Sequence, residues 1–159
     1  MANFLEQLVC EFYEFRGYFV RQNVMVGRRA KGGYEGELDV VAFHPVEKKL
    51  VHIEPSMDAH TWEKREERFA KKFAAGRSHI PALFVGLDVP TDIEQIALFG
   101  YGSRGARTHV GGGRIVLVSE FMNEIADALR GKRVQTAAIP EGFPLLRTVQ
   151  FTLQHVVDH

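Results

Sequence analysis

Acidic side chains recur in the first third of the chain at spacings that would let them act together. Glu37 and Asp39 lie two residues apart, and Glu54 ends a later apolar run. Glu11 lies at the margin of the apolar stripe of a helical segment nearer the N-terminus. Carboxylates gathered in a partly apolar place repel each other and lose hydration unless protons or a cation compensate them. The four acids therefore indicate a site for a hard divalent cation, Mg²⁺ or Mn²⁺, the alternative being acids that simply face water at strand ends.

Hydrophobic spacing predicts the elements that would position these acids. Residues 3–16 carry apolar side chains at helical intervals and stop at Gly17, while residues 18–26 are rich in β-branched and aromatic types. A second strand begins near residue 35, and its period of two puts Glu37 and Asp39 on one face. A third strand covers residues 50–54. Because a short turn at residues 44–48 joins these two strands, we expect them to be antiparallel neighbours whose acids meet at one end of a sheet.

The rest of the chain predicts further helices and strands. We expect helices at residues 61–75, ended by Gly76, at 92–99, and at 119–129, capped by Ser119. Expected strands cover residues 82–87, 114–118 and 134–139, and a glycine-rich loop covers 100–113. Residues 148–154 favour one more strand, with a helix as the alternative. The fold class is therefore α/β, with a central mixed sheet flanked by helices and extra C-terminal elements.

Two short sequences carry a resemblance to a known superfamily. They are Gly36-Glu37-Leu38-Asp39-Val40-Val41-Ala42 and Val51-His52-Ile53-Glu54-Pro55-Ser56, set in the order helix, three strands, helix, strand. This pattern resembles the restriction-endonuclease-like, PD-(D/E)xK nucleases, and it is most similar to their Holliday-junction-resolvase-like branch. The resemblance implies one domain over residues 1–159, with a core at about 3–118 and a C-terminal extension at about 132–159. It also implies that Asp39 and Glu54 bind the metal and that Glu11 matches an acid of the first helix.

The chain departs from the superfamily pattern at one position. Ser56 stands where the resemblance implies a lysine that positions and polarises the attacking water, and a hydroxyl cannot supply that charge. Basic residues on the following helix are the candidates to replace it. On the helical wheel, Arg65 and Lys72 flank the apolar face. We therefore expect one of these two to supply the charge, unless both belong to a solvated basic flank.

Three arginines are the candidates for contact with a nucleic acid. Arg104, Arg107 and Arg114 lie in a stretch, residues 101–114, that has no acid. The same region holds a G-x-G-x-x-G pattern at residues 100–105, but no buried strand leads directly from it into a helix, as a dinucleotide-binding loop requires. We therefore expect a loop that contacts phosphates of the DNA backbone.

Composition limits the class of protein. The 159 residues are 45% hydrophobic and 25% charged, which is typical of one globular domain and excludes wholesale disorder. Twenty basic and twenty acidic residues cancel, so the overall charge gives no argument for a polyanionic partner. A single cysteine, Cys10, excludes an internal disulfide and makes structural zinc improbable. No apolar run is long enough to span a bilayer, and we expect a cytoplasmic protein with no membrane partner.

These observations favour a Mg²⁺-dependent DNA endonuclease or resolvase-like phosphodiesterase. The second interpretation is a catalytically degenerate relative that binds nucleic acid or a protein without cleavage. A third is a structural subunit, such as a homodimer, joined through an edge strand at residues 148–154. Cleavage would separate the first from the others.

Overall fold

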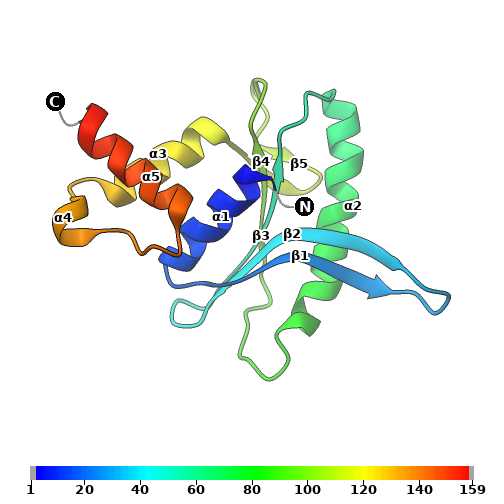
Figure 1. Cartoon of the computed structure of the whole chain (residues 1–159). Helices are drawn as coiled ribbons and strands as arrows, with labels where there is room; N and C mark the ends of the chain where they lie inside the picture. The colour runs from blue at the N-terminus through cyan, green and yellow to red at the C-terminus, as the bar shows by residue number, and fades with distance from the viewer. Residues whose placement is uncertain (1–2, 158–159) are drawn as a thin grey trace.

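The protein is an α/β structure with a six-stranded mixed sheet flanked by helices (Figure 1), seen in a computed structural model that describes residues 3–157. The strand order is β1-β2-β3-β4-β6-β5. Strands β1, β2 and β3 are antiparallel neighbours, whereas β4 is parallel to both β3 and β6. The strands are β1 (Phe19–Arg28), β2 (Tyr34–His44), β3 (Lys49–Ser56), β4 (Glu94–Phe99), β5 (His109–Val110) and β6 (Gly113–Leu117).

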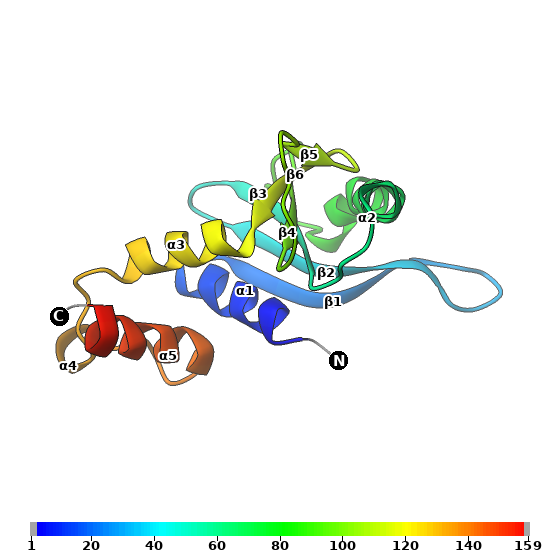
Figure 2. The same ribbon diagram turned by 90° about the horizontal axis from the view of Figure 1, so that it is seen from above.

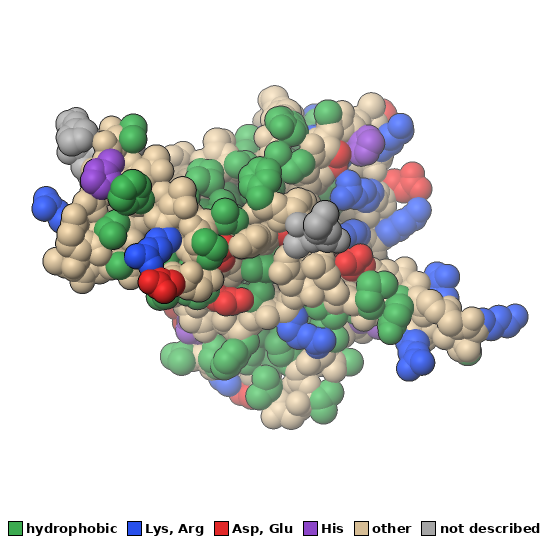
Figure 3. All heavy atoms as spheres, viewed as in Figure 1, with side chains coloured by type: hydrophobic (Ala, Val, Ile, Leu, Met, Phe, Trp, Pro, Cys, Tyr) green, Lys and Arg blue, Asp and Glu red, His purple; other side chains and the backbone are tan. Residues whose placement is uncertain are grey.

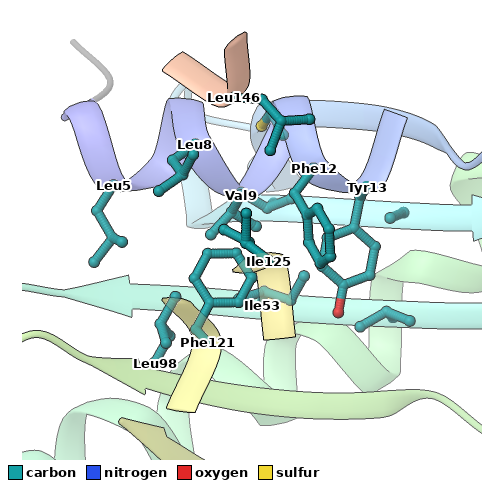
Figure 4. Packing of buried hydrophobic residues seen from close by; sticks show 14 of the residues in the cluster. Leu5, Leu8, Val9, Phe12, Tyr13, Ile53, Leu98, Phe121, Ile125 and Leu146 are labelled. Atoms are coloured by element: carbon teal, nitrogen blue, oxygen red, sulfur yellow. The ribbon is translucent and has the colours of Figure 1, made fainter. Parts of the chain in front are cut away.

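Helices cover both faces of the sheet (Figure 2). The helices are α1 (Phe4–Phe15), α2 (Trp62–Leu83), α3 (Val118–Leu129), α4 (Val134–Ala137) and α5 (Pro144–Thr152), and a π-helical segment follows at Leu153–Val157. Helices α1, α3 and α5 share a core with one face, where Val9, Ile125 and Leu146 are fully buried (Figure 4). Helix α2 packs on the other face through Phe69 and Phe73. None of the described helices is long and apolar enough to cross a membrane.

The ladder between β2 and β3 ends beside the acids that the sequence singled out. The paired register runs from His44↔Lys49 to Val40↔Ile53 and stops there. Asp39 and Glu54 are the next residues on each strand. On the other side of β2, the register with β1 passes over Asn23, which has a positive φ of 52°. The sheet is therefore distorted or open on both sides of Asp39.

The predicted α/β class is confirmed, and so is the order of helix, three strands, helix and strand. The predicted helices and strands after residue 75 were wrong in three places. Helix α2 does not stop at Gly76 but continues to Leu83, so the strand expected at residues 82–87 is instead the end of that helix and a turn. The strand after α2 is β4, where a helix was expected at residues 92–99. The cause is that Ile96 and Leu98 face one core while Ala97 and Phe99 face the other, and a short run buried on both sides has no readable period.

The C-terminal strands were also wrong. Residues 134–137 form the short helix α4, and residues 144–152 form α5, which was the alternative at that place. Leu146 and Gln150, four residues apart, are the buried side chains of α5, and Pro144 begins it, as is common in a first helical turn. Helix α3 begins at Val118, and Glu120, not Ser119, caps it by accepting from the Leu117 amide at 2.8 Å. The edge strand that a structural subunit would have used is therefore absent from residues 148–154.

Candidate active site

Asp39 and Glu54 meet where β2 and β3 separate. The Asp39 amide donates to Glu54 Oε1 at 3.1 Å, so a side chain takes the hydrogen bond that a strand partner would otherwise provide. The Glu54 side chain is 1% exposed, whereas that of Asp39 is 13% exposed. The pair is therefore anchored in the core at Glu54 and reaches solvent at Asp39.

Lys72 of α2 completes this cluster. Its Nζ donates to Asp39 Oδ1 at 2.7 Å and to Glu54 Oε2 at 2.5 Å. The lysine comes from the edge of the buried face of α2, next to Phe73, whose ring is fully buried against the sheet. With a side chain 24% exposed, the ammonium lies at the mouth of the site. One positive and two negative charges thus lie within hydrogen-bond distance of each other.

Arg65, the other candidate for the missing positive charge, and Ser56 both lie in a different cluster. Ser56 is buried, and its hydroxyl donates to Asp58 rather than toward Glu54. Arg65 also contacts Asp58, with 3.2 Å from Nε to Oδ1, and its guanidinium carbon lies 4.3 Å from the centre of the Phe99 ring. Burial raises the pKa of Asp58, but hydrogen bonds from Ser56, the His60 amide and Arg65 outweigh it and lower that pKa to about 2. Arg65 and Ser56 therefore belong to a second, structural cluster at the start of α2.

A series of buried hydrogen bonds fixes the Glu54 side chain from the interior of the protein. His52 lies two residues earlier on β3, is fully buried, and its Nε2 lies 2.7 Å from Glu54 Oε1. Gln95 Nε2 lies 3.1 Å from His52 Nδ1 and donates to the Phe73 carbonyl at 2.8 Å, while its Oε1 accepts from Arg77 at 2.9 Å. Because these contacts make Nε2 of Gln95 the donor, His52 Nδ1 accepts and its Nε2 carries the proton donated to Glu54.

Helix α2 can pass over these hydrogen bonds because residue 76 is glycine. A Cβ built on Gly76 would lie 2.6 Å from His52 Cε1 and 3.0 Å from Gln95 Nε2. The φ angle of Gly76 is not positive, so its backbone conformation does not require glycine. Glycine is required here because the neighbouring side chains come so close. The glycine that predicted a helix end instead lets α2 approach His52 of β3 and Gln95 of β4 closely.

The electrostatics of the site follow from burial and from the paired acids. Burial, the charge of Glu54 and a hydrogen bond with it raise the pKa of Asp39 to about 6, against the opposing effect of Lys72. Burial lowers the pKa of Lys72, but Glu54 and Asp39 outweigh it and raise that pKa above its ordinary value. Burial, with Lys72 and Arg77, lowers the pKa of His52 to about 3. His52 is therefore neutral at neutral pH.

The first-helix acid whose charge interacts with that of Asp39 is Glu6, which was not among the predicted site residues. Burial raises the pKa of Glu6, and the charge of Asp39 adds to that effect. Glu6 Oε2 is buried and has no hydrogen-bond partner within residues 3–157. On a wheel defined by one apolar stripe, Glu6 falls nearly opposite the stripe. Helix α1 has buried residues on most sides because α5 also packs on it, so a single stripe could not identify Glu6.

Of the two other predicted metal ligands, Glu11 is held by another helix, and Glu37 lies two residues from Asp39 on the same face of β2. Glu11 Oε1 accepts from the amides of Leu145 and Leu146 at 2.9 and 3.1 Å, and so it binds the first turn of α5. Glu37 pairs with Met25 through the β1–β2 ladder, but its side chain is exposed and makes no hydrogen bond or ion pair in the described range. Within residues 3–157, no three acidic, histidine or cysteine side chains are grouped as a metal cage.

The three arginines of residues 101–114, which were expected to contact DNA, have partners inside the protein. Arg104 pairs with Glu120 at 2.6 Å, and Arg114 pairs with Glu94 at 2.7 Å. The guanidinium of Arg107 lies over the ring of Trp62, 4.9 Å from its centre. Two of these guanidinium groups are therefore neutralised by ion pairs, and the third lies over an aromatic ring.

Comparisons with known proteins identify a similar fold and no family. No family model matches the chain, and no curated protein matches it. Among solved structures, the crystal structure of a protein of unknown function, AF1548, is similar, with a TM-score of 0.52 and 17% identity. The match covers 92% of this chain and 78% of that chain. At this identity the likeness concerns the fold alone.

Proposed function

We propose that the protein is a metal-dependent DNA nuclease with a restriction-endonuclease-like core, and that Asp39, Glu54 and Lys72 form its active site. The observation that carries the proposal is the Lys72 ammonium within hydrogen-bond distance of both carboxylates at the opening between β2 and β3. A lysine beside two acids is the set that the resemblance to PD-(D/E)xK nucleases implies. Here the lysine comes from α2, while position 56 on the strand holds serine.

The side chains present fit a hard divalent cation. Asp39 and Glu54 offer carboxylate oxygens, and Mg²⁺ is commonly held by one or two carboxylates together with waters and substrate phosphate oxygens. A cage of three protein ligands is therefore not required. Glu6, whose Oε2 lacks a hydrogen-bond partner in residues 3–157, is a further oxygen donor whose charge interacts with that of Asp39. A bound Mg²⁺ would polarise the phosphoryl oxygen and lower the pKa of a bound water.

Each of the three site residues then has a defined role in catalysis. Glu54, held at both carboxylate oxygens, keeps one fixed orientation in the core. Asp39, at the solvent side, faces the incoming phosphodiester. Lys72 offers a positive charge at the mouth of the site, where it can orient the attacking water and offset negative charge that grows on the phosphate. Phosphodiester hydrolysis is the reaction that this set supports best.

One observation favours the degenerate alternative. Lys72 already compensates the two carboxylates, and a lysine bound between two acids also stabilises a protein that cuts nothing. In that case the cluster serves the packing of α2 on β3.

A cleavage assay tests the proposal. Wild-type protein, Asp39→Asn and Glu54→Gln are incubated with linear and four-way-junction DNA, with Mg²⁺, with Mn²⁺ and with a chelator, and Glu47→Gln is the control on an exposed turn. We expect cleavage only with metal, and a loss of about 100-fold or more in the two site variants but not in the control. Absence of cleavage by the wild type on every substrate would contradict the proposal and leave the degenerate alternative.

A further inference from the structure

The turn between β1 and β2 concentrates positive charge in a chain with no net charge. Residues 19–36 hold four basic residues and one acid, and therefore a net charge of +3. Three of the basic residues, Arg28, Arg29 and Lys31, lie at the tip of the hairpin. All three are exposed. Figure 1 shows this hairpin extending past the rest of the sheet, and Figure 3 shows Lys and Arg side chains at its end.

The tip of the hairpin is a turn closed by backbone hydrogen bonds. Arg28 still pairs with Tyr34 in the ladder. The Arg29 amide then donates to the Gly33 carbonyl at 2.9 Å, and the Gly32 amide donates to the Arg29 carbonyl at 3.1 Å. Positive φ angles of 95° at Gly32 and 80° at Gly33 close this turn, as only glycine does readily. The backbone thus keeps the three basic residues together at the end of the hairpin.

The cations of the tip have no partner within the described residues 3–157. Arg28, Arg29 and Lys31 make no side-chain hydrogen bond or ion pair there, and the nearest acid in sequence, Glu35, hydrogen-bonds with His79 at 2.9 Å. This differs from the glycine-rich loop, whose arginines are paired or stacked. The tip therefore keeps its full charge available to a polyanion.

The hairpin and the candidate active site belong to the same strand. Asp39 lies five residues from Tyr34 along β2, so at roughly 3.3 Å per residue the start of the tip, where Arg28 pairs with Tyr34, lies about 17 Å from the site. One turn of B-DNA is about 34 to 36 Å long, so this span is roughly half a turn. A duplex with a phosphate at Asp39 would then present backbone phosphates to the tip.

We infer that the β1–β2 hairpin grips the phosphate backbone of duplex DNA about half a helical turn from the site of cleavage. This inference rests on the proposed function, because it places the scissile phosphate at Asp39. The tip favours a phosphate backbone over a membrane surface, since residues 28–33 hold no apolar side chain larger than that of Ala30, and interfacial anchors need larger ones. Its contacts are independent of DNA sequence.

The test compares two triple variants that remove the same charge. One is Arg28→Ala/Arg29→Ala/Lys31→Ala at the tip, and the control is Arg130→Ala/Lys132→Ala/Arg133→Ala, three exposed cations between α3 and α4. Fluorescence anisotropy with a 30-base-pair duplex, without divalent metal and from 50 to 300 mM KCl, gives the slope of log affinity against log salt. Because each phosphate contact contributes about 0.9 to that slope, the tip variant is expected to flatten it by about 2 to 3, with the control unchanged.

The outcomes separate this inference from the proposed function. A wild-type slope in the tip variant, or an equal loss in both variants, would overturn the hairpin inference even if the wild type cuts DNA. Tip-dependent binding to anionic phospholipid vesicles without binding to DNA would also overturn it. A slope that depends on the tip, in a protein that cuts nothing, would support the hairpin and contradict the nuclease.

Discussion

Glu54 is held at both carboxylate oxygens by groups of its own chain. His52 and the Asp39 amide bind one oxygen, and Lys72 binds the other. Buried carboxylates are tolerated only when such partners replace the lost water. The chain of bonds through Gln95 to Arg77 extends this support to the far side of α2, so the orientation of Glu54 depends on residues well outside the site.

At Gly76, a single methyl group tests this support. Gly76→Ala adds a Cβ that collides with His52 and Gln95, so the chain of hydrogen bonds must shift. Helix propensity alone would favour alanine by about 1 kcal/mol, but overpacking costs roughly 1 to 3 kcal/mol and a displaced buried donor adds to it. We expect a net loss of stability in urea denaturation, with Ser78→Ala on the exposed side of α2 stable or slightly stabilised. An alanine at 76 that raised stability would show that His52 and Gln95 are free to move.

Some helices and strands could be predicted from the sequence and others could not. Helix α1 and strands β1 to β3 end at clear stops, such as Gly17 and the turn at residues 44–48, and the prediction placed them within a few residues. Helix α2 continues past Gly76 because its partner β3 needs a close approach there, which no local pattern announces. Strand β4 is buried on both faces, so its apolar run has no alternation to distinguish it from a helix.

Pairing of Asp39 with Glu54 could be predicted because a short turn forces two antiparallel strands to meet. The helical wheel narrowed the candidates for the catalytic positive charge to Arg65 and Lys72. The choice between them depended on the position of Asp58, which binds Arg65. Glu6 could not be chosen over Glu11, since the packing of α5 on α1 changes which face of α1 is free. Long-range contacts, and not local propensity, determined each of these cases.

For the whole molecule, two polar side chains order the C-terminal extension, one from the core and one within the extension. Glu11 of α1 accepts from two amides in the first turn of α5. Gln150 of α5 is buried and bonds to the backbone of Ile139, Lys132 and Ala137. A negative charge at a helix N-terminus is favourable, and these contacts satisfy backbone groups that would otherwise be buried without partners. The acid expected at a metal site thus joins α5 to α1.

Replacement of Glu11 separates these two roles. Glu11→Ala leaves two amides of α5 without their acceptor, which costs roughly 1 to 3 kcal/mol in the free energy of unfolding. Urea denaturation should show this loss, while Glu14→Ala, on the exposed side of the same helix, should show little change. Calorimetry should show that Mn²⁺ binds Glu11→Ala as it binds the wild type. Weakened Mn²⁺ binding at unchanged stability would return Glu11 to the metal site.

The most direct test of the account is single-turnover DNA cleavage by Lys72→Ala, compared with Lys71→Ala one residue away. Lys71 is exposed and pairs with Glu67 of its own helix, so its loss removes the same charge from α2 without touching Asp39 or Glu54. We expect Lys72→Ala to lose cleavage by about 100-fold or more, the scale of one well-placed charge in a catalytic site, while Lys71→Ala cuts as the wild type does. A Lys72→Ala protein that stays folded and cuts at the wild-type rate would contradict the assignment of the catalytic lysine to α2.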